Sequence, residues 1–177
     1  VYRTGVNIED LVLSILATSE AVLTNRQKEL GVVVINIGGS TTSLSVFEEG
    51  DILHTAVLPI GSDHITSDVA IGLRISIDLA EKIKLEYGSA SSTGINKRDE
   101  IDIGELEGEE SNLVSQKYIA EITEARVEEI LDKVDAELKK IGKSGKLPAG
   151  VVLTGGGALL RDLVETTKKR LRLPAVI

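Results

Sequence analysis

The chain has no Cys, no Met and no Trp among its 177 residues, and it contains only one Phe, three Tyr and two His. The absence of Cys excludes thiolate metal sites and thiol catalysis, and it fits a reducing compartment. With only His54 and His64 available, a zinc site or a Ser-His-Asp triad is disfavoured, and both His are expected to be structural. No apolar run approaches the roughly 20 residues that a membrane span needs.

Charge and size narrow the class of protein further. The net charge is -8, which excludes a general attraction to nucleic acid or to anionic lipid. A hydrophobic content of 42% is enough for one well-buried domain, or for two small lobes that share a core. Because the chain opens on Val1 and contains no Met, we expect it to be an excised fragment or an incompletely recorded sequence.

A hairpin with a small-residue tip is the most informative stretch. The β-branched run 32–37 ends in Gly38-Gly39-Ser40-Thr41-Thr42, and apolar alternation then resumes at Leu44. This pattern predicts two strands joined by a tight turn. Glycines let backbone N–H groups approach a ligand closely, which suits a phosphate. An ordinary hairpin turn that needs glycine for its dihedral angles is the alternative.

Periodicity and breakers predict the other elements. In chain order they are a helix over 15–30, a strand over 51–58, a helix over 64–72 capped by Ser62 or Asp63, a helix over 76–87, an acidic hairpin over 99–115 turning near Gly108 with disorder as its alternative, a helix over 118–141, a buried strand over 150–154, a helix from Gly155 to about Leu173, and a short strand over 174–177.

A second glycine cluster, Gly155-Gly156-Gly157, follows the buried strand 150–154. The N–H groups at a helix start are free to bind a ligand. The cluster lacks the spacing of a dinucleotide fold and of a P-loop. Two glycine turns at the carboxyl ends of strands in one sheet nevertheless predict a nucleotide held between them. Because the sheet-forming segments lie at both ends of the chain, we expect a second lobe inserted between them.

These stretches resemble a known superfamily. INIGGSTTSLSVFEEGDILHTAVLPIG is similar to the phosphate-binding hairpin of actin-like ATPases, and VVLTGGGALLRDL to their adenosine-contacting turn. HTAVLPIGSDHITSDVAIGLRISIDLAEKIKLEYGSA resembles the cell-division FtsA family, but only its C-terminal half. The resemblance implies an α/β, actin-like (ribonuclease H-like) fold with a mixed-sheet lobe and an inserted α+β subdomain. It places a lead-in from the preceding lobe at 1–30, subdomain 2A at 31–60 and 148–177, and subdomain 2B at 61–147.

The same resemblance implies a site for ATP with Mg²⁺. Glu81 and Lys84 are expected to hold the ribose and adenine, because they lie three residues apart on one helical face; a solvated surface pair is the alternative. The implied phosphate residues are Asn36, Gly38, Gly39, Ser40, Thr41, Thr42, Gly61 and Ser62, and the implied adenosine residues are Glu81, Lys84, Gly155, Gly156 and Gly157.

Two positions depart from the family pattern D-x-G-G-G-T. Asn36 replaces the acid, so no carboxylate is there to hold magnesium waters or the attacking water. We therefore expect at most a weak ATPase. Ser40 replaces the third glycine, and a left-handed backbone there would cost about 1 kcal/mol.

The resemblance also implies an adaptor function. Such a protein polymerises and tethers filaments of the tubulin-like protein FtsZ to the inner face of the cell membrane at the division site, through a membrane segment absent from this chain. Lys117 and Arg126 are the expected contacts for the acidic-hydrophobic FtsZ tail, with ordinary exposed charges as the alternative. As half of a cleft, the chain is expected to bind ATP weakly or not at all. Other hypotheses are a pilus-assembly adaptor that binds a membrane-partner peptide and, less favoured, a sugar-kinase-type phosphotransferase.

Overall fold

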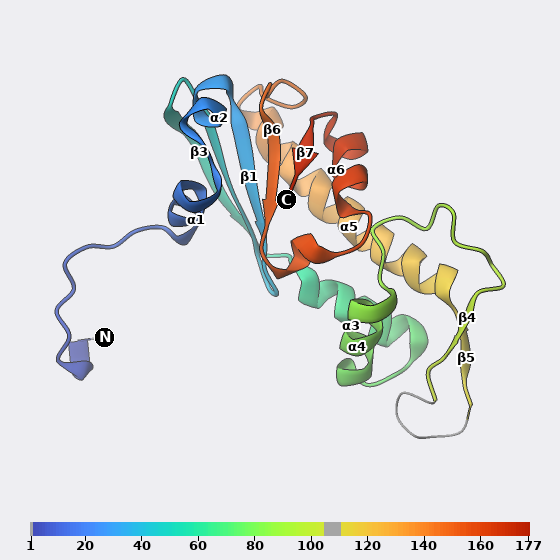
Figure 1. Cartoon of the computed structure of the whole chain (residues 1–177). Helices are drawn as coiled ribbons and strands as arrows, with labels where there is room; N and C mark the ends of the chain where they lie inside the picture. The colour runs from blue at the N-terminus through green and yellow to red at the C-terminus, as the bar shows by residue number, and fades with distance from the viewer. Residues whose placement is uncertain (1, 105–110) are drawn as a thin grey trace.

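A five-stranded mixed sheet organises the molecule. The computed structural model describes residues 2–104 and 111–177, and its sheet runs in the order β3-β2-β1-β6-β7 (Figure 1). β1 pairs antiparallel with β2 and parallel with β6, and β7 is parallel to β6. The strands are β1 (Val32–Ile37), β2 (Thr42–Glu48), β3 (Asp51–Leu58), β6 (Gly150–Thr154) and β7 (Ala175–Val176).

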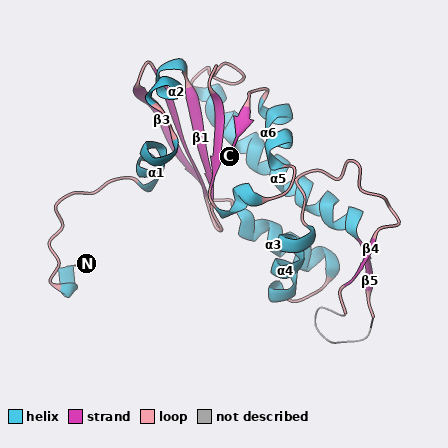
Figure 2. Ribbon diagram, viewed as in Figure 1, coloured by secondary structure: helices cyan, strands magenta, loops and turns pink. Residues whose placement is uncertain are grey.

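The central strand β1 is buried on both faces, as its unbroken β-branched sequence predicts. Val33 and Ile35 belong to the main core, whereas Val32 and Val34 belong to a smaller core on the opposite face. Helices α5 (Gln116–Lys140) and α6 (Leu163–Leu171) cover the first face, and α1 (Ser14–Val22) and α2 (Asn25–Leu30) lie against the second (Figure 2). The sheet is therefore a middle layer between helices.

A mostly helical block lies at one end of the sheet and contains α3 (Ser62–Leu73), α4 (Ile77–Tyr87) and the antiparallel pair β4 (Glu100–Asp102) and β5 (Leu113–Ser115). The long helix α5 begins in this block and ends beside the sheet (Figure 1). The fold class expected from the sequence is confirmed by this mixed α/β architecture. The exact division into subdomains stays a prediction, and the turn expected near Gly108 lies outside the described residues.

Three local expectations were wrong. The single helix over 15–30 is broken by extended backbone at Leu23 and Thr24, because Thr24 starts α2 with a capping box to Gln27. Helix α3 is capped at Gly61 rather than by the side chain of Ser62 or Asp63. The helix expected from Gly155 is instead a 3-10 turn, η2 (Gly156–Leu159), followed by α6, because Leu160 is extended and Asp162 has left-handed backbone.

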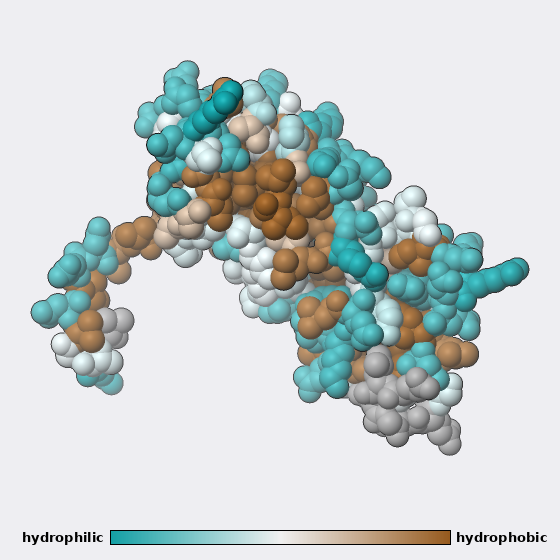
Figure 3. Space-filling model, in the orientation of Figure 1, coloured by the Kyte–Doolittle hydropathy of each residue, from teal (hydrophilic) through white to brown (hydrophobic). Residues whose placement is uncertain are grey.

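The N-terminal segment extends away from the sheet (Figure 3). After the 3-10 turn η1 (Tyr2–Thr4), residues 5–13 have no regular secondary structure. Several apolar side chains of this arm are exposed, namely Val6, Ile8, Leu11, Val12 and Leu13. No helix in the described part of the chain is both long and apolar enough to cross a membrane.

Candidate functional site

The two glycine loops lie side by side at one edge of the sheet. β1 and β6 are parallel neighbours with Asn36 opposite Thr154, so the loops that follow them, 38–42 and 155–157, leave the same end of the sheet. A Cβ on Gly155 would lie 2.3 Å from Asn36 Oδ1, and one on Gly157 would lie 2.4 Å from Ile37 Cγ2. The 155–157 loop thus packs against the end of β1, where the 38–42 loop begins, and only glycine allows that approach.

The 38–42 loop is a tight turn without backbone strain. The Gly38 N–H donates to the Thr41 carbonyl at 2.9 Å, and the buried Thr42 hydroxyl donates to the Ile60 carbonyl at 2.8 Å. Ser40 is not among the residues with left-handed backbone. The strain considered for Ser40 at the third glycine position is therefore absent.

The start of α3 is docked against this loop. The N–H groups of Ser62 and Asp63 donate to the carbonyls of Gly38 and Gly39, both at 2.9 Å, and a Cβ on Gly61 would lie 2.2 Å from the Gly39 carbonyl oxygen. Gly61 and Ser62 therefore lie beside the loop as expected, but these two N–H groups already have acceptors inside the protein.

Asp63 brings a carboxylate to the tip of the same loop, and sequence reasoning missed it. Its Oδ2 accepts a hydrogen bond from Ser40 Oγ at 3.0 Å, and both of its oxygens lie 2.8 Å from the position of a Cβ on Gly39. The acid that Asn36 does not provide is thus present nearby on a different element. Only the fold reveals this, because Asn36 is on β1 whereas Asp63 is on α3.

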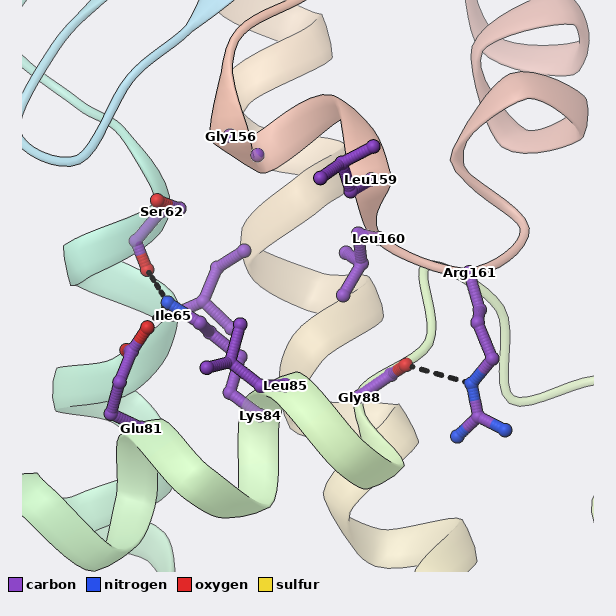
Figure 4. Close-up of a pocket in the computed structure, with 11 residues that line it drawn as sticks. Ser62, Ile65, Glu81, Lys84, Leu85, Gly88, Gly156, Leu159, Leu160 and Arg161 are labelled. Carbon is purple, nitrogen blue, oxygen red and sulfur yellow. Dashed lines mark hydrogen bonds and ion pairs between the residues drawn. The ribbon is translucent and has the colours of Figure 1, made fainter.

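A pocket of about 440 Å³ lies between α3, α4 and η2 (Figure 4). It brings together five of the residues that the sequence assigned to a nucleotide: Ser62, Glu81, Lys84, Gly156 and Gly157. Gly155 does not line it. The lining residues that sequence reasoning missed are Ile65, Leu85, Gly88, Leu159, Leu160 and Arg161.

Glu81 and Lys84 form an ion pair at this pocket, with Lys84 buried and Glu81 partly exposed. Lys84 Nζ lies 2.6 Å from Glu81 Oε2, with the Lys84 side chain 7% and the Glu81 side chain 41% exposed. Burial raises the pKa of Glu81, but hydrogen bonds from Lys84 and Thr66 outweigh it, and the pKa lies below its usual value. The Glu81 side chain is therefore charged at neutral pH.

Two exposed leucines give the pocket its apolar walls. Leu85 on α4 is 75% exposed and Leu159 on η2 is 78% exposed, and both line the pocket from opposite sides (Figure 4). Large apolar side chains this exposed suit a flat apolar ligand face. Each lies within two residues of a residue assigned to adenosine, which is the signal that could have identified it.

The two expected partner residues lie apart on α5. Arg126 lines a groove of about 340 Å³ with Asp68, Ile122, Ala125 and Glu129, whereas Lys117 is in the first turn of α5 and does not line it. Nine residues of helix separate them by roughly 13 Å along the axis. The structure does not bring them into one cluster.

Arg126 already has carboxylate partners. Its Nε and Nη2 donate to the two oxygens of Asp68 at 2.6 and 2.9 Å, and its Nη1 pairs with Glu129. The hydrogen bonds to Asp68 hold the pKa of Arg126 above its usual value. Because the Glu129 side chain is 45% exposed, an incoming carboxylate could replace it more readily than Asp68.

The two His contact protein groups. His54 Nε2 lies 3.0 Å from Glu137 Oε2, which joins β3 to α5. His64 Nδ1 accepts the Gly61 N–H at 3.2 Å. Among the described residues, no three His, Cys, Asp or Glu side chains group as a metal site.

A family model and the curated relatives that match this chain name the same protein family. Residues 33–177 match the family described as cell division protein FtsA. Cell division protein FtsA of Pseudomonas aeruginosa is 37% identical over 174 residues, which cover 98% of this chain and 42% of that protein. The chain thus spans about two fifths of the length of that relative.

Solved structures agree on the fold. MreB 5 of Spiroplasma citri, described as bound to AMPPNP, superimposes with a TM-score of 0.75 and 25% identity over 92% of this chain and 52% of that one. The chain from a PilM-PilN type IV pilus biogenesis complex gives a TM-score of 0.61 with 19% identity over 85% of this chain and 36% of that one. The second similarity concerns the fold alone.

Proposed function

Because the chain belongs to the FtsA family of cell-division proteins, we propose that it is the partner-binding half of an actin-like scaffold that binds ATP, polymerises and tethers FtsZ filaments to the membrane. The observation that carries this proposal is that the 155–157 loop packs against the end of β1, where the 38–42 loop begins, beside a pocket lined by Glu81 and Lys84. That arrangement fits one wall of a nucleotide cleft. The resemblance noted in the sequence is confirmed for the family by the family model and for the fold by the solved structures.

The nucleotide would lie across both loops. We assign the phosphates to Gly38, Gly39, Ser40, Thr41 and Thr42 of the 38–42 loop, with Asn36, Gly61 and Ser62 beside it. We assign the adenosine to the 440 Å³ pocket, where the base would lie between Leu85 and Leu159, with Glu81 and Lys84 beside it and Gly155, Gly156 and Gly157 behind it. Apolar walls with a few fixed polar groups are typical of small-molecule sites.

Magnesium fits this arrangement because Asp63 lies at the tip of the 38–42 loop. A carboxylate repels a bare phosphate but tolerates one whose charge is shared with a divalent cation. Mg²⁺ usually takes one or two carboxylates and completes its shell with phosphate oxygens and water. Asn36 supplies no negative charge, so we expect hydrolysis to be weak at most.

The proposal includes a division of the chain into subdomains. In this proposal residues 31–60 and 148–177 are subdomain 2A and residues 61–147 are subdomain 2B. The arm within 1–30 would belong to the surface facing the preceding lobe, because its exposed apolar side chains suit an interface.

We assign the FtsZ tail to the groove at Arg126, with Lys117 at the start of α5 as an outlying contact. The groove combines apolar Ile122 and Ala125 with one arginine, and an acidic-hydrophobic peptide matches both features. A peptide carboxylate would replace the exposed Glu129 on the guanidinium, while Asp68 keeps the other edge in place. Hydrogen bonds between a guanidinium and a carboxylate are stronger than those between neutral groups.

Titration with a synthetic FtsZ C-terminal tail peptide tests the proposal. We expect saturable binding by fluorescence anisotropy, and Arg126→Gln should weaken it at least tenfold, or about 1.4 kcal/mol. Glutamine is preferable to glutamate, which would add a third carboxylate beside Asp68. Lys133→Gln is the matched control, because Lys133 also pairs with Glu129, at 3.4 Å, without lining the groove; its affinity should stay within about twofold.

Equal affinity of wild type and Arg126→Gln for the peptide would show that Arg126 does not contact the FtsZ tail. No binding by the wild type would favour the second candidate, a pilus-type adaptor that binds another membrane-partner peptide. A sugar-kinase-type phosphotransferase ranks below both, because it needs an acid where β1 ends and the chain has Asn36.

A further inference from the structure

Thr66 on α3 makes contacts that neither the fold nor the proposed function accounts for. Its side chain is buried, with 4% exposure, and its hydroxyl lies between the two charged residues of the pocket. Thr66 Oγ1 donates to Glu81 Oε2 at 2.5 Å and accepts from Lys84 Nζ at 2.9 Å. Thr66 itself does not line the pocket, so it can act on a ligand only through these partners.

The hydroxyl completes a closed triangle. Lys84 Nζ also bonds Glu81 Oε2 at 2.6 Å, and it reaches the Ser62 carbonyl at 3.4 Å (Figure 4). Thr66 and Lys84 therefore both bond the same carboxylate oxygen of Glu81, Oε2. The hydroxyl proton has an alternative acceptor in the Ser62 carbonyl at 3.4 Å, but the carboxylate is closer and charged.

The triangle fixes Glu81 with Oε2 occupied and leaves Oε1 outside these bonds. A carboxylate is a good acceptor for ribose hydroxyls. The Glu81 carboxylate favours ribose-containing ligands only if it is held in one orientation, because ordering a free side chain on binding costs affinity. A half-exposed glutamate without hydrogen-bond partners would be free to rotate and would bind ribose hydroxyls more weakly.

We propose that Thr66 is a positioning residue for ribose recognition: its hydroxyl orients Glu81 against Lys84, so that Glu81 Oε1 selects ligands with ribose hydroxyls. This inference rests on the proposed nucleotide site and names the residue that gives the site its sugar selectivity. Sequence alone did not single out Thr66, because its role arises where α3 packs against α4.

The test compares Thr66→Val, which keeps the shape and removes the hydroxyl, with Thr66→Ser, which keeps the hydroxyl. NMR titrations follow the Glu81 and Lys84 side chains at millimolar ATP and 2′,3′-dideoxy-ATP. We expect wild type and Thr66→Ser to prefer ATP. In Thr66→Val the preference should fall about fivefold, with the dideoxy affinity unchanged.

A second readout does not need a ligand. Because the Thr66 hydrogen bond helps lower the pKa of Glu81, Thr66→Val should raise that pKa, and Thr66→Ser should leave it near the wild-type value. Glu81→Gln should also lose the preference for ATP, and adding Thr66→Val to it should change the preference no further.

The possible failures are distinguishable. If wild type prefers ATP and Thr66→Val keeps that preference, the positioning inference is wrong while the nucleotide site stands. Equal affinity losses for both nucleotides would mean that Thr66 acts only on pocket structure, which also overturns it. If ATP causes no saturable shift in the wild-type pocket, the proposed nucleotide site fails and the inference fails with it.

Discussion

Gly155→Ala should lower the free energy of unfolding by about 3 kcal/mol, whereas Gly156→Ala should change it by no more than about 0.5 kcal/mol. Gly155 has a φ of +86°, which L side chains rarely adopt, and its Cβ would lie 2.3 Å from Asn36 Oδ1 and 2.5 Å from the Ile37 carbonyl oxygen. Left-handed backbone costs roughly 1–2 kcal/mol and overpacking roughly 1–3 kcal/mol. A Cβ on Gly156 meets nothing within 4 Å.

Thermal unfolding measures this difference directly. For a chain of this size, about 3 kcal/mol corresponds to a lowering of Tm by roughly 10 °C. The adjacent Gly156→Ala variant controls for the general effect of adding a methyl group to the 155–157 loop. If the two variants unfold at the same temperature, the 155–157 loop does not press against the end of β1.

Thr167→Val should stabilise the protein by about 1–2 kcal/mol. Thr167 on α6 is fully buried, and among the described residues its Oγ1 is the buried side-chain oxygen that lacks a hydrogen-bond partner. Burying an unsatisfied hydroxyl costs free energy. Valine has nearly the same shape, so it removes that cost without leaving a cavity.

Thr123→Val is the matched control. Thr123 on α5 is equally buried, but its hydroxyl donates to the Ile119 carbonyl at 2.9 Å. Valine there removes a hydrogen bond worth roughly 0.5–1.5 kcal/mol, so no stabilisation is expected. Urea unfolding of both variants gives the comparison. A gain at Thr123 as large as that at Thr167 would show that hydrophobicity, rather than the missing partner, determines the effect.

The sheet could be predicted from sequence because its signals are local. The strands 32–37, 51–58 and 150–154 have the bounds that β-branched runs and flanking glycines indicate. The actin-like fold followed from the glycine motifs and the family from the run that begins at His54, and both are confirmed by the relatives. The break at Thr24 was also readable, since Thr24 and Gln27 have capping-box spacing.

The site could be predicted only in part. Glycines and the Glu81–Lys84 pair carry motif signals, whereas Thr66 and Asp63 matter only because α3 packs against α4 and against the 38–42 loop. The η2 turn replaced a helix because of the backbone at Leu160 and Asp162, for which the sequence has no glycine or proline signal. Likewise, the resemblance implied Arg126 as a partner contact, but the sequence could not show that Asp68 already binds it.

The measurement that tests the central proposal most directly is an NMR titration of this chain with ATP and Mg²⁺, followed at every backbone amide. Because the proposal gives this chain one wall of the cleft, we expect weak, saturable binding in which amides of 38–42 and 155–157 shift together, with the same apparent affinity. Shifts confined to one loop, or to neither, would contradict a shared nucleotide site. Tight magnesium-dependent binding would contradict the proposal that half of the cleft is missing here.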